Sequence, residues 1–417
     1  MAMPETKAKQ RPLLLIHALK AVLSIFTSTF LTSYIVSLNA DNIWGKGIFN
    51  IGLLYLTGYV TYITVYYLLS FFVSKSNRII FLRLGILVNC VLLTVITFYG
   101  QTIAQWIVVA GILYGLGEAF YYASYLVIKN ELVDKKYINN YHLASIVATN
   151  LVNIIVPTLL GFLIDISTYT NIALYVILLC VLQFVLSFFV QGQAVAKSSF
   201  QIKAFVKFLR TDKFARDKIK YTYWNSFLAG FKNTYKILIV ILTIYAFATN
   251  LSLGILTSVF SVFTILLLAL YKKFEYHARL NKLVLYLIIS LLPVITCLLF
   301  ICLPNKACLI AVNLCLTIAI YFSEYGTSCE RDAIIKNLHQ EKFISEHQFF
   351  SEFFIFVGRV IAYSGFIVVG LFANINVFKV LLLVLISLMP IKFWVMYQQT
   401  KIRKALEATP SEVSVPN

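Results

Sequence analysis

Charged residues are scarce in this sequence. Only 12% of its 417 residues are Asp, Glu, Lys or Arg, about half the share of an average soluble domain, whereas 60% are hydrophobic. The mean hydropathy of +0.85 points the same way. A soluble core cannot bury so much apolar surface, but a lipid bilayer can. The composition therefore excludes an ordinary soluble domain and favours a membrane protein.

The sequence also lacks the motifs of common catalytic and metal sites. It contains no Gly-rich phosphate loop and no H-E-x-x-H pattern, and its five histidines are scattered. None of the seven cysteines forms a C-x-x-C pair, and most lie in apolar runs, where a cysteine is typically a small buried hydrophobe. Cys302 and Cys308 flank a short predicted loop, and oxidation could join them. We therefore expect no enzyme activity, no cofactor and no metal.

Positive charge, by contrast, is in excess. A net charge of +18 in a soluble protein would suggest nucleic-acid binding. Here the basic residues lie in short segments between apolar runs, so we interpret them as topology signals beside an anionic leaflet. We expect the lipid bilayer, and no nucleic acid, as the partner of this charge.

Apolar runs separated by short polar breaks occur twelve times. Each is long enough to cross ~30 Å of hydrocarbon at about 1.5 Å per residue. The sequence therefore predicts an all-α membrane protein with about twelve transmembrane helices, and the first run, which is longer than a signal peptide's, is expected to be retained. The runs fall at roughly 13–38, 48–74, 79–99, 103–128, 141–165, 171–192, 221–246, 251–271, 282–303, 307–328, 346–372 and 376–398.

The distribution of Lys and Arg predicts the orientation. With a cytoplasmic N-terminus, the outer segments carry only three of the 35 basic residues, Lys46, Lys306 and Lys379. Three more remain inside predicted spans, namely Lys232, Lys236 and Arg359. All the others, Lys20 and Lys392 included, are assigned to inner segments. Because cytoplasmic loops are rich in Lys and Arg, both termini are expected to face the cytoplasm.

The longest polar stretch divides the chain into two halves of six helices. The predicted parts are an N-terminal half at 1–192, a basic cytoplasmic linker at 193–220, a C-terminal half at 221–400 and a cytoplasmic tail at 401–417. A shift of about 205 residues lays FTST at 26–29 over FKNT at 231–234. Such weak internal similarity fits two pseudo-symmetric bundles. In the linker, lysines alternate with Phe205, Phe208 and Phe214, which fits either an amphipathic helix on the membrane surface or a solvated connection.

Two six-helix halves, a basic central loop and cytoplasmic termini resemble the major facilitator superfamily over nearly the whole chain. The family's loop motif after helix two, G-x-x-x-D-[RK]-x-G-[RK]-[RK], is reduced to Lys75 and Arg78, because Ser70 and Ser74 replace its Gly and Asp. The gating role of that Asp is therefore not carried over. The family's antiporter motif is reduced to Pro157 and Gly161, which weakens an antiport reading. GLGEAFYYASY at 115–125 and SEFFIFVGRV at 351–360 resemble a group of bacterial permeases.

Predicted helix four carries the first candidate site. Tyr114, Glu118, Tyr121 and Tyr125 follow the spacing of one helical face, with the carboxylate near mid-span. An ionisable group inside a bilayer is expensive, and it usually serves a substrate or ion pathway. We interpret this face as an amphipathic substrate or coupling wall, with a structural carboxylate bonded to a neighbouring helix as the alternative.

Predicted helix seven carries Lys232 and Lys236 one turn apart. Two ammonium groups deep in a span repel each other unless an anion or carboxylates lie between them. They are therefore candidates for binding an anionic substrate group or for pairing with Glu118 or Glu324. The alternative is that the lysine side chains snorkel to the interface.

Helices ten and eleven supply the remaining candidates. Glu324 is a candidate proton carrier or site residue, and Arg359 lies two turns inside the membrane, where a guanidinium prefers a bidentate carboxylate partner. Direct substrate contact and a gating ion pair both remain open for Arg359. Residues near the ends of spans are interpreted as gate or ion-pair residues, and these are Arg78, Glu330, Arg331, Asp332 and Glu352.

The sequence as a whole favours a monomeric secondary transporter in a bacterial cytoplasmic membrane. The substrate would be a small molecule, anionic or amphipathic, and the coupling ion a proton or another ion. Two alternatives stay open: a flippase of lipids or lipid-linked precursors on the same fold, and a membrane sensor or scaffold that does not transport.

Overall fold

The computed structural model describes residues 3–72, 78–132, 138–190, 200–277, 282–338, 340 and 343–408. Within these ranges all regular structure is helical, and twelve helical stretches are long and apolar enough to cross a membrane. Because hydrocarbon offers no hydrogen-bond partners, each span satisfies its backbone groups internally, which is why apolar runs of this length fold as helices. The protein is therefore an all-α, multi-pass membrane protein, as the sequence predicts.

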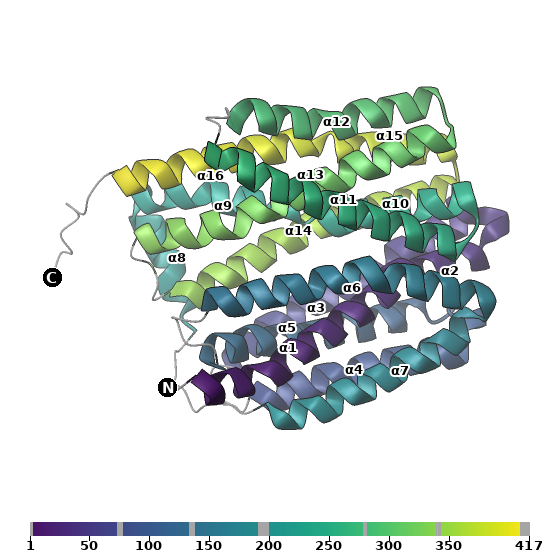
Figure 1. The fold of residues 1–417 in the computed structure, drawn as a ribbon, viewed down its shortest axis with the longest axis horizontal. Helices are drawn as coiled ribbons and strands as arrows, with labels where there is room; N and C mark the ends of the chain where they lie inside the picture. Colours follow the sequence, from purple (N-terminus) through teal and green to yellow (C-terminus); the bar gives the residue numbers. More distant parts are fainter. Residues whose placement is uncertain are drawn as a thin grey trace. The chain divides into compact units, whose positions relative to one another are not determined.

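Sixteen α-helices make up the described parts of the chain, some of them sections of one span (Figure 1). They are, in chain order, α1 (Met3–Ile25), α2 (Leu31–Leu38), α3 (Ile48–Phe72), α4 (Arg78–Tyr99), α5 (Ile107–Leu132), α6 (Ile138–Ile166), α7 (Tyr169–Leu186), α8 (Ile202–Thr211), α9 (Lys213–Ala229), α10 (Lys232–Phe247), α11 (Asn250–His277), α12 (Lys282–Cys302), α13 (Lys306–Asn337), α14 (Ile344–Phe372), α15 (Ile375–Ile386) and α16 (Leu388–Ala408).

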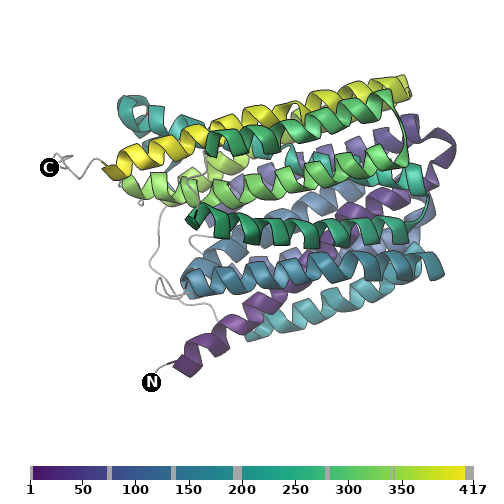
Figure 2. The same cartoon turned by 45° about the horizontal axis from the view of Figure 1, so that its top comes forward.

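The chain divides into two compact units. Unit 1 comprises Met1–Ser199, Lys236–Val262 and Tyr363–Phe378, and unit 2 comprises Phe200–Tyr235, Phe263–Ala362 and Lys379–Asn417. Within unit 1, α5 packs along α3 and α4, and α7 lies beside α4, as both views show (Figures 1 and 2). Within unit 2, α12 and α13 pack against each other and against α16.

The first span of unit 1 contains an irregular turn. Residues Phe26–Phe30 form a π-helical turn between α1 and α2. Tyr55 of α3 supports this turn, because its hydroxyl lies 3.3 Å from the carbonyl oxygens of Thr27 and Ser28 and 3.0 Å from the Thr32 hydroxyl. Such turns inside helices recur at functional sites, and this one begins at Phe26, less than two turns beyond the buried Lys20 described below.

The seventh span is broken where α9 ends and α10 begins. The break falls at Gly230 and Phe231, and a Cβ on Gly230 would collide with the backbone of α14 at the carbonyl of Ile355 and at Gly358. The two glycines let α9 and α14 of unit 2 cross at close range. Lys232 and Lys236 therefore lie together in the first turns of α10, one turn apart as predicted, whereas Asn225 lies on α9.

Candidate functional site

A buried ion pair lies inside unit 1. The ammonium group of Lys20 on α1 donates a hydrogen bond to the carboxylate of Glu118 on α5 and lies 5.4 Å from the centre of the Tyr121 ring. Lys20 is 2% exposed, and the Glu118 side chain is 12% exposed. Buried charges are tolerated when they are paired, and these two groups lie in direct contact.

An aromatic layer lies beside the pair. The ring of His17, one turn before Lys20, stacks on Tyr125 at 4.6 Å, and Tyr125 stacks on Tyr121 at 5.6 Å. The Tyr125 hydroxyl is 3.3 Å from the hydroxyl of Tyr141 on α6. Nδ1 of His17 and the Tyr121 hydroxyl are buried and have no hydrogen-bond partner among the described residues. Unfilled donors and acceptors beside an ion pair suit a site that takes up water or a polar ligand.

A cluster of four tyrosines continues from the ion pair. Tyr114 lies one turn before Glu118 on α5, and its ring meets Tyr55 and Tyr59 of α3 edge-on at 5.8 and 6.1 Å. Tyr363 of α14 stacks on the same two rings at 5.2 and 5.5 Å. These rings bring α3, α5 and the section of α14 that belongs to unit 1 together on an amphipathic surface.

The far end of α6 is joined to α11 by a carboxylate. Asp165 accepts hydrogen bonds from the backbone N–H of Asn250 (3.1 Å), the amide group of Asn250 (3.0 Å) and the backbone N–H of Leu251 (2.8 Å). These donors form the N-terminus of α11, where a negative charge is favoured. The hydroxyl of Ser33 on α2 donates to the Asn250 side chain at 2.6 Å. The same two helices, α6 and α11, also contact each other about two turns further along, where the Thr158 hydroxyl donates a hydrogen bond of 2.8 Å to the Ser258 hydroxyl.

Unit 2 has its own buried polar network. The amide of Asn225 on α9 donates to the side chain of Gln399 on α16, and Gln399 in turn donates to the Thr222 hydroxyl at 3.3 Å. The Tyr223 hydroxyl bonds Nδ1 of His347 on α14 at 2.9 Å, and Nε2 of His347 bonds Gln340 at 2.9 Å. Most of these groups are partnered in the manner of a structural network, although Oδ1 of Asn225 is buried without a hydrogen-bond partner among the described residues.

The structure brings together the candidate residues of predicted helix four. Tyr114, Glu118, Tyr121 and Tyr125 share α5, and Glu118 bonds Lys20 of α1, not Lys232 or Lys236, the lysines named as its candidate partners. Lys20 was assigned to an inner segment, yet it lies within the first span. It stands eight residues into a run that is apolar on both sides, LLLIHALKAVLSIF, and this depth was the signal that charge counting overlooked.

The other candidates are distributed between the units. Lys236 begins the second section of unit 1, is exposed, and makes no hydrogen bond or ion pair with the residues that the structure describes. In unit 2, Lys232, Arg331, Glu352 and Arg359 each interact with neighbouring groups. Arg78 of unit 1 is half-buried and also has a partner. The side chains of Glu324, Glu330 and Asp332 lie outside the described residues.

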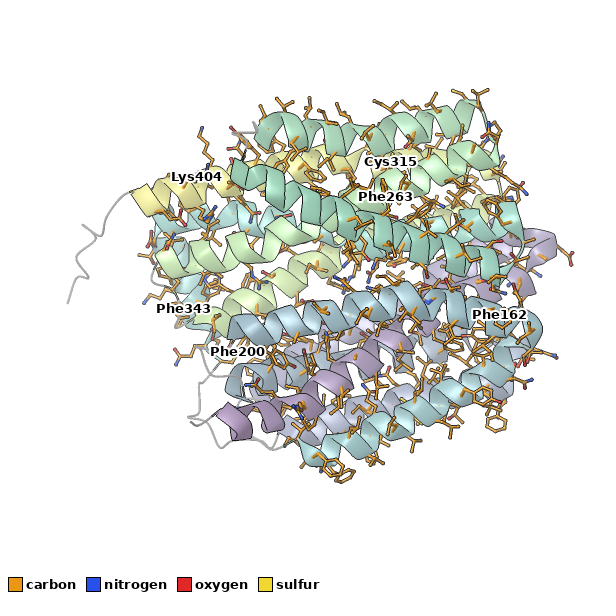
Figure 3. The ribbon with its side chains drawn as sticks, viewed as in Figure 1. Phe162, Phe200, Phe263, Cys315, Phe343 and Lys404 are labelled. Atoms are coloured by element: carbon orange, nitrogen blue, oxygen red, sulfur yellow. The ribbon has the colours of Figure 1, made fainter. Side chains whose placement is uncertain are left out.

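The cysteines and acidic residues form no evident metal centre. Among the described residues, no group of three or more His, Cys, Asp or Glu side chains could hold a metal ion. Cys302 and Cys308 are both free thiols, and Cys315, labelled in Figure 3, is a free thiol of α13. The candidate site therefore rests on the ion pair, the histidine and the tyrosines of unit 1.

Comparison with known proteins agrees with this architecture. The family described as the Major Facilitator Superfamily matches residues 18–329. The fold is similar to the crystal structure of a bacterial homologue of the iron transporter ferroportin in an inward-facing state, with 12% identity and a TM-score of 0.70 over 96% of this chain and 99% of that one. It is also similar to a mutant of the nucleoside transporter NupG, with 11% identity and a TM-score of 0.64 over 96% and 99%. No curated protein matches the sequence.

Proposed function

Because this chain belongs to the Major Facilitator Superfamily, we propose that it is a secondary active transporter that moves a small molecule by alternating access, driven by an ion gradient. The membrane is the bacterial cytoplasmic membrane, with both termini on the cytoplasmic side. The basic residues that the sequence gathers on one side support this orientation. The two neighbouring structures are transporters of different substrates, so they support transport and leave the cargo open.

The buried ion pair of Lys20 and Glu118 is the observation that supports the proposed coupling to an ion gradient. Protonation of Glu118 would remove the negative charge that holds the Lys20 ammonium. Lys20 would then be an uncompensated cation in a low-dielectric setting, where it favours an anionic ligand group or a conformation that admits water. In this scheme Lys20 pairs with the Glu118 carboxylate in one state and, after Glu118 takes up a proton, with an anionic group of the substrate in the other.

Side-chain chemistry supports an anionic or amphipathic cargo. Lys236 is exposed within the span Lys213–Phe247 and makes no ion pair with the described residues. A lysine facing hydrocarbon at this depth is costly, so a water-filled passage is its preferred environment. The tyrosine cluster of Tyr55, Tyr59, Tyr114 and Tyr363 offers flat rings with polar tips, which suit a ligand with an apolar body.

A ligand screen tests the binding half of the proposal. The purified full-length protein is melted in detergent with organic anions, sugars, amino acids, nucleosides, ferrous iron and lipids, in parallel with Lys236→Ala. A compound at a hundredfold excess over its Kd stabilises the folded state by about 2.7 kcal/mol. We expect an anionic compound to raise the melting temperature of the native protein and to leave the variant unchanged. Stabilisation by lipids alone would favour the flippase.

Gradient-driven uptake tests the coupling half. The stabilising compound is offered to proteoliposomes with and without a pH gradient, using the native protein, Glu118→Gln and Glu324→Gln. Glu407→Gln is the matched control, because Glu407 is exposed and pairs only locally with Arg403. We expect Glu118→Gln to keep binding and to lose its response to the gradient. An unchanged response in both Glu118→Gln and Glu324→Gln would contradict proton coupling through these carboxylates.

A further inference from the structure

Helix α8 is held against unit 2 by its apolar face. Phe205 is fully buried, and its ring lies 5.4 Å from Phe343, 4.6 Å from His347 and 5.3 Å from Phe350. The carboxylate of Glu346, which is 2% exposed, accepts a hydrogen bond of 2.6 Å from the backbone N–H of Gln201 at the start of α8. The apolar face of this amphipathic helix is therefore covered by protein and is not free to enter a membrane.

The surface on which α8 rests is itself rigid. His347 is fixed by the hydrogen bonds of Tyr223 and Gln340, and Phe200, just before α8, meets Phe349 edge-on at 5.8 Å. Phe343 and Phe200 are labelled at this end of unit 2 in Figure 3. Because both the helix and its support are held in place, the residues on the outer face of α8 project in a defined direction.

That outer face is a row of cations. Lys203, Lys207 and Arg210 are spaced i, i+4 and i+7, so they lie on one face of α8, and all three are exposed. No ion pair involving these three side chains occurs within the part of the chain that the structure describes. Within the described ranges, no carboxylate neutralises the charge of this row.

A second basic row follows on the first turns of α9. Lys213, Arg216 and Lys220 are exposed at i, i+3 and i+7. Lys220 lies 3.7 Å from the exposed carboxylate of Asp217, and the carboxylate of Asp212 accepts a hydrogen bond of 2.8 Å from the backbone N–H of Ala215. Exposed aromatic rings lie on the same helix and on α16. Phe214 and Trp224 on α9 are each 57% exposed, and Trp394 on α16 is 52% exposed. Exposed indole rings at the end of a membrane span prefer the headgroup region.

We propose that the outer faces of α8 and the first turns of α9 form a binding site for the phosphate headgroups of anionic phospholipids. The exposed aromatic rings would lie in the interfacial layer, where the headgroups meet the acyl chains, while the ammonium and guanidinium groups bind the phosphodiesters. Each basic side chain near an anionic surface strengthens binding by about fivefold. The segment joins the two predicted halves, so bound lipid would anchor the connection between them to the bilayer.

Lipid binding to the purified full-length protein tests the site. After delipidation, native mass spectrometry measures the titration of dioleoyl phosphatidylglycerol and, separately, dioleoyl phosphatidylcholine. The test variant is Lys203→Gln/Lys207→Gln/Arg210→Gln, which alters exposed side chains only. The matched control, Lys46→Gln/Lys306→Gln/Lys379→Gln, removes the same charge from the predicted outer segments. We expect phosphatidylglycerol affinity to fall at least about tenfold in the test variant and to stay within about twofold in the control.

Three outcomes would overturn the proposal. They are equal binding of the two lipids by the native protein, equal loss in the test and control variants, and displacement of phosphatidylglycerol by millimolar inorganic phosphate, which would indicate a soluble-anion site. Phe205→Ala separates charge from position, because it frees α8 without removing a cation. We expect it to weaken phosphatidylglycerol binding as well, and unchanged binding would show that the docked geometry is not required. None of these readouts depends on transport, so they remain informative if the proposed function fails.

Discussion

Two buried lysines, one in each unit, have nearly the same exposed fraction but differ in whether a carboxylate pairs with them. Lys20 on α1 of unit 1 is 2% exposed and bonds Glu118, whereas Lys392 on α16 of unit 2 is 3% exposed. Among the described residues, Lys392 makes neither a hydrogen bond nor an ion pair. Burial alone therefore does not tell what a charged side chain does, since its partner decides whether removing it harms the protein.

Replacing these two lysines is expected to change the free energy of unfolding in opposite directions. Removing one member of a buried pair leaves the other charge without compensation, whereas replacing an unpaired buried cation with an apolar side chain removes a desolvation cost. A lysine retained without a partner is the kind of group that a protein keeps for a ligand or for conformational change. The comparison therefore predicts that unit 1 depends on Lys20 for stability and that unit 2 does not depend on Lys392 for folding.

The largest expected effect is that of Lys20→Met. The substitution leaves the Glu118 carboxylate buried without its counter-ion, and we expect a loss of about 3–5 kcal/mol in the free energy of unfolding. Thermal melting of the purified protein in detergent measures the direction and rank of this loss. The double variant Lys20→Met/Glu118→Gln should recover most of it, because no lone charge remains. Identical melting of the single and double variants would show that the pair contributes little.

Lys392→Met should act in the opposite direction. Methionine has a similar length and no charge, so we expect stability to be unchanged or to rise by about 1–4 kcal/mol. The same melting measurement applies, with Lys20→Met as the reference. A loss as large as that of Lys20→Met would contradict the comparison, because it would show that the Lys392 ammonium is satisfied in the native protein.

The sequence does not predict that Lys20 is paired and Lys392 is not, because partners are set by tertiary packing. The number of spans and the shared face of Tyr114, Glu118, Tyr121 and Tyr125 follow from apolar run length and helical spacing, and both were predicted. Charge counting assigned Lys20 and Lys392 to inner segments, because it locates a lysine by its distance from the end of a run. Which carboxylate faces which ammonium depends on helix packing across about a hundred residues of chain, and no local pattern records it.

Two irregular features escaped prediction on similar grounds. Lys232 and Lys236 share α10 at the predicted spacing, but the apolar run did not reveal that the span is interrupted at Gly230 and Phe231, just before Lys232. The alternation of basic and aromatic residues in the linker was equally compatible with a membrane surface and with solvent. It could not indicate the observed arrangement, in which Phe205 of α8 docks on protein, Phe214 of α9 is exposed and the basic face of α8 stays exposed.

A substitution of Gly161 in unit 1 gives a stability loss that does not involve charge and that can be compared with the loss expected for Lys20→Met. Gly161 of α6 has no room for a Cβ, which would collide with the carbonyl of Asn250 at the start of α11. We expect Gly161→Ala to cost about 1–3 kcal/mol, less than Lys20→Met. Gly47→Ala is the matched control, because the nearest atom to its added Cβ is at 3.5 Å, an ordinary contact. If both alanine variants melt alike, the α6–α11 contact is looser than the structure indicates.

The smallest expected effect comes from an ion pair at the surface. Lys220 and Asp217 are 3.7 Å apart, and their side chains are 49% and 61% exposed. Water and salt screen such a pair, and holding two long side chains together costs entropy, so we expect Asp217→Asn to change stability by less than about 1 kcal/mol. Melting at low and high salt should show even this difference fade as salt rises. A salt-independent loss near that of Lys20→Met would mean that exposure does not govern the value of an ion pair here, and the contrast between Lys20 and Lys392 would then need another cause.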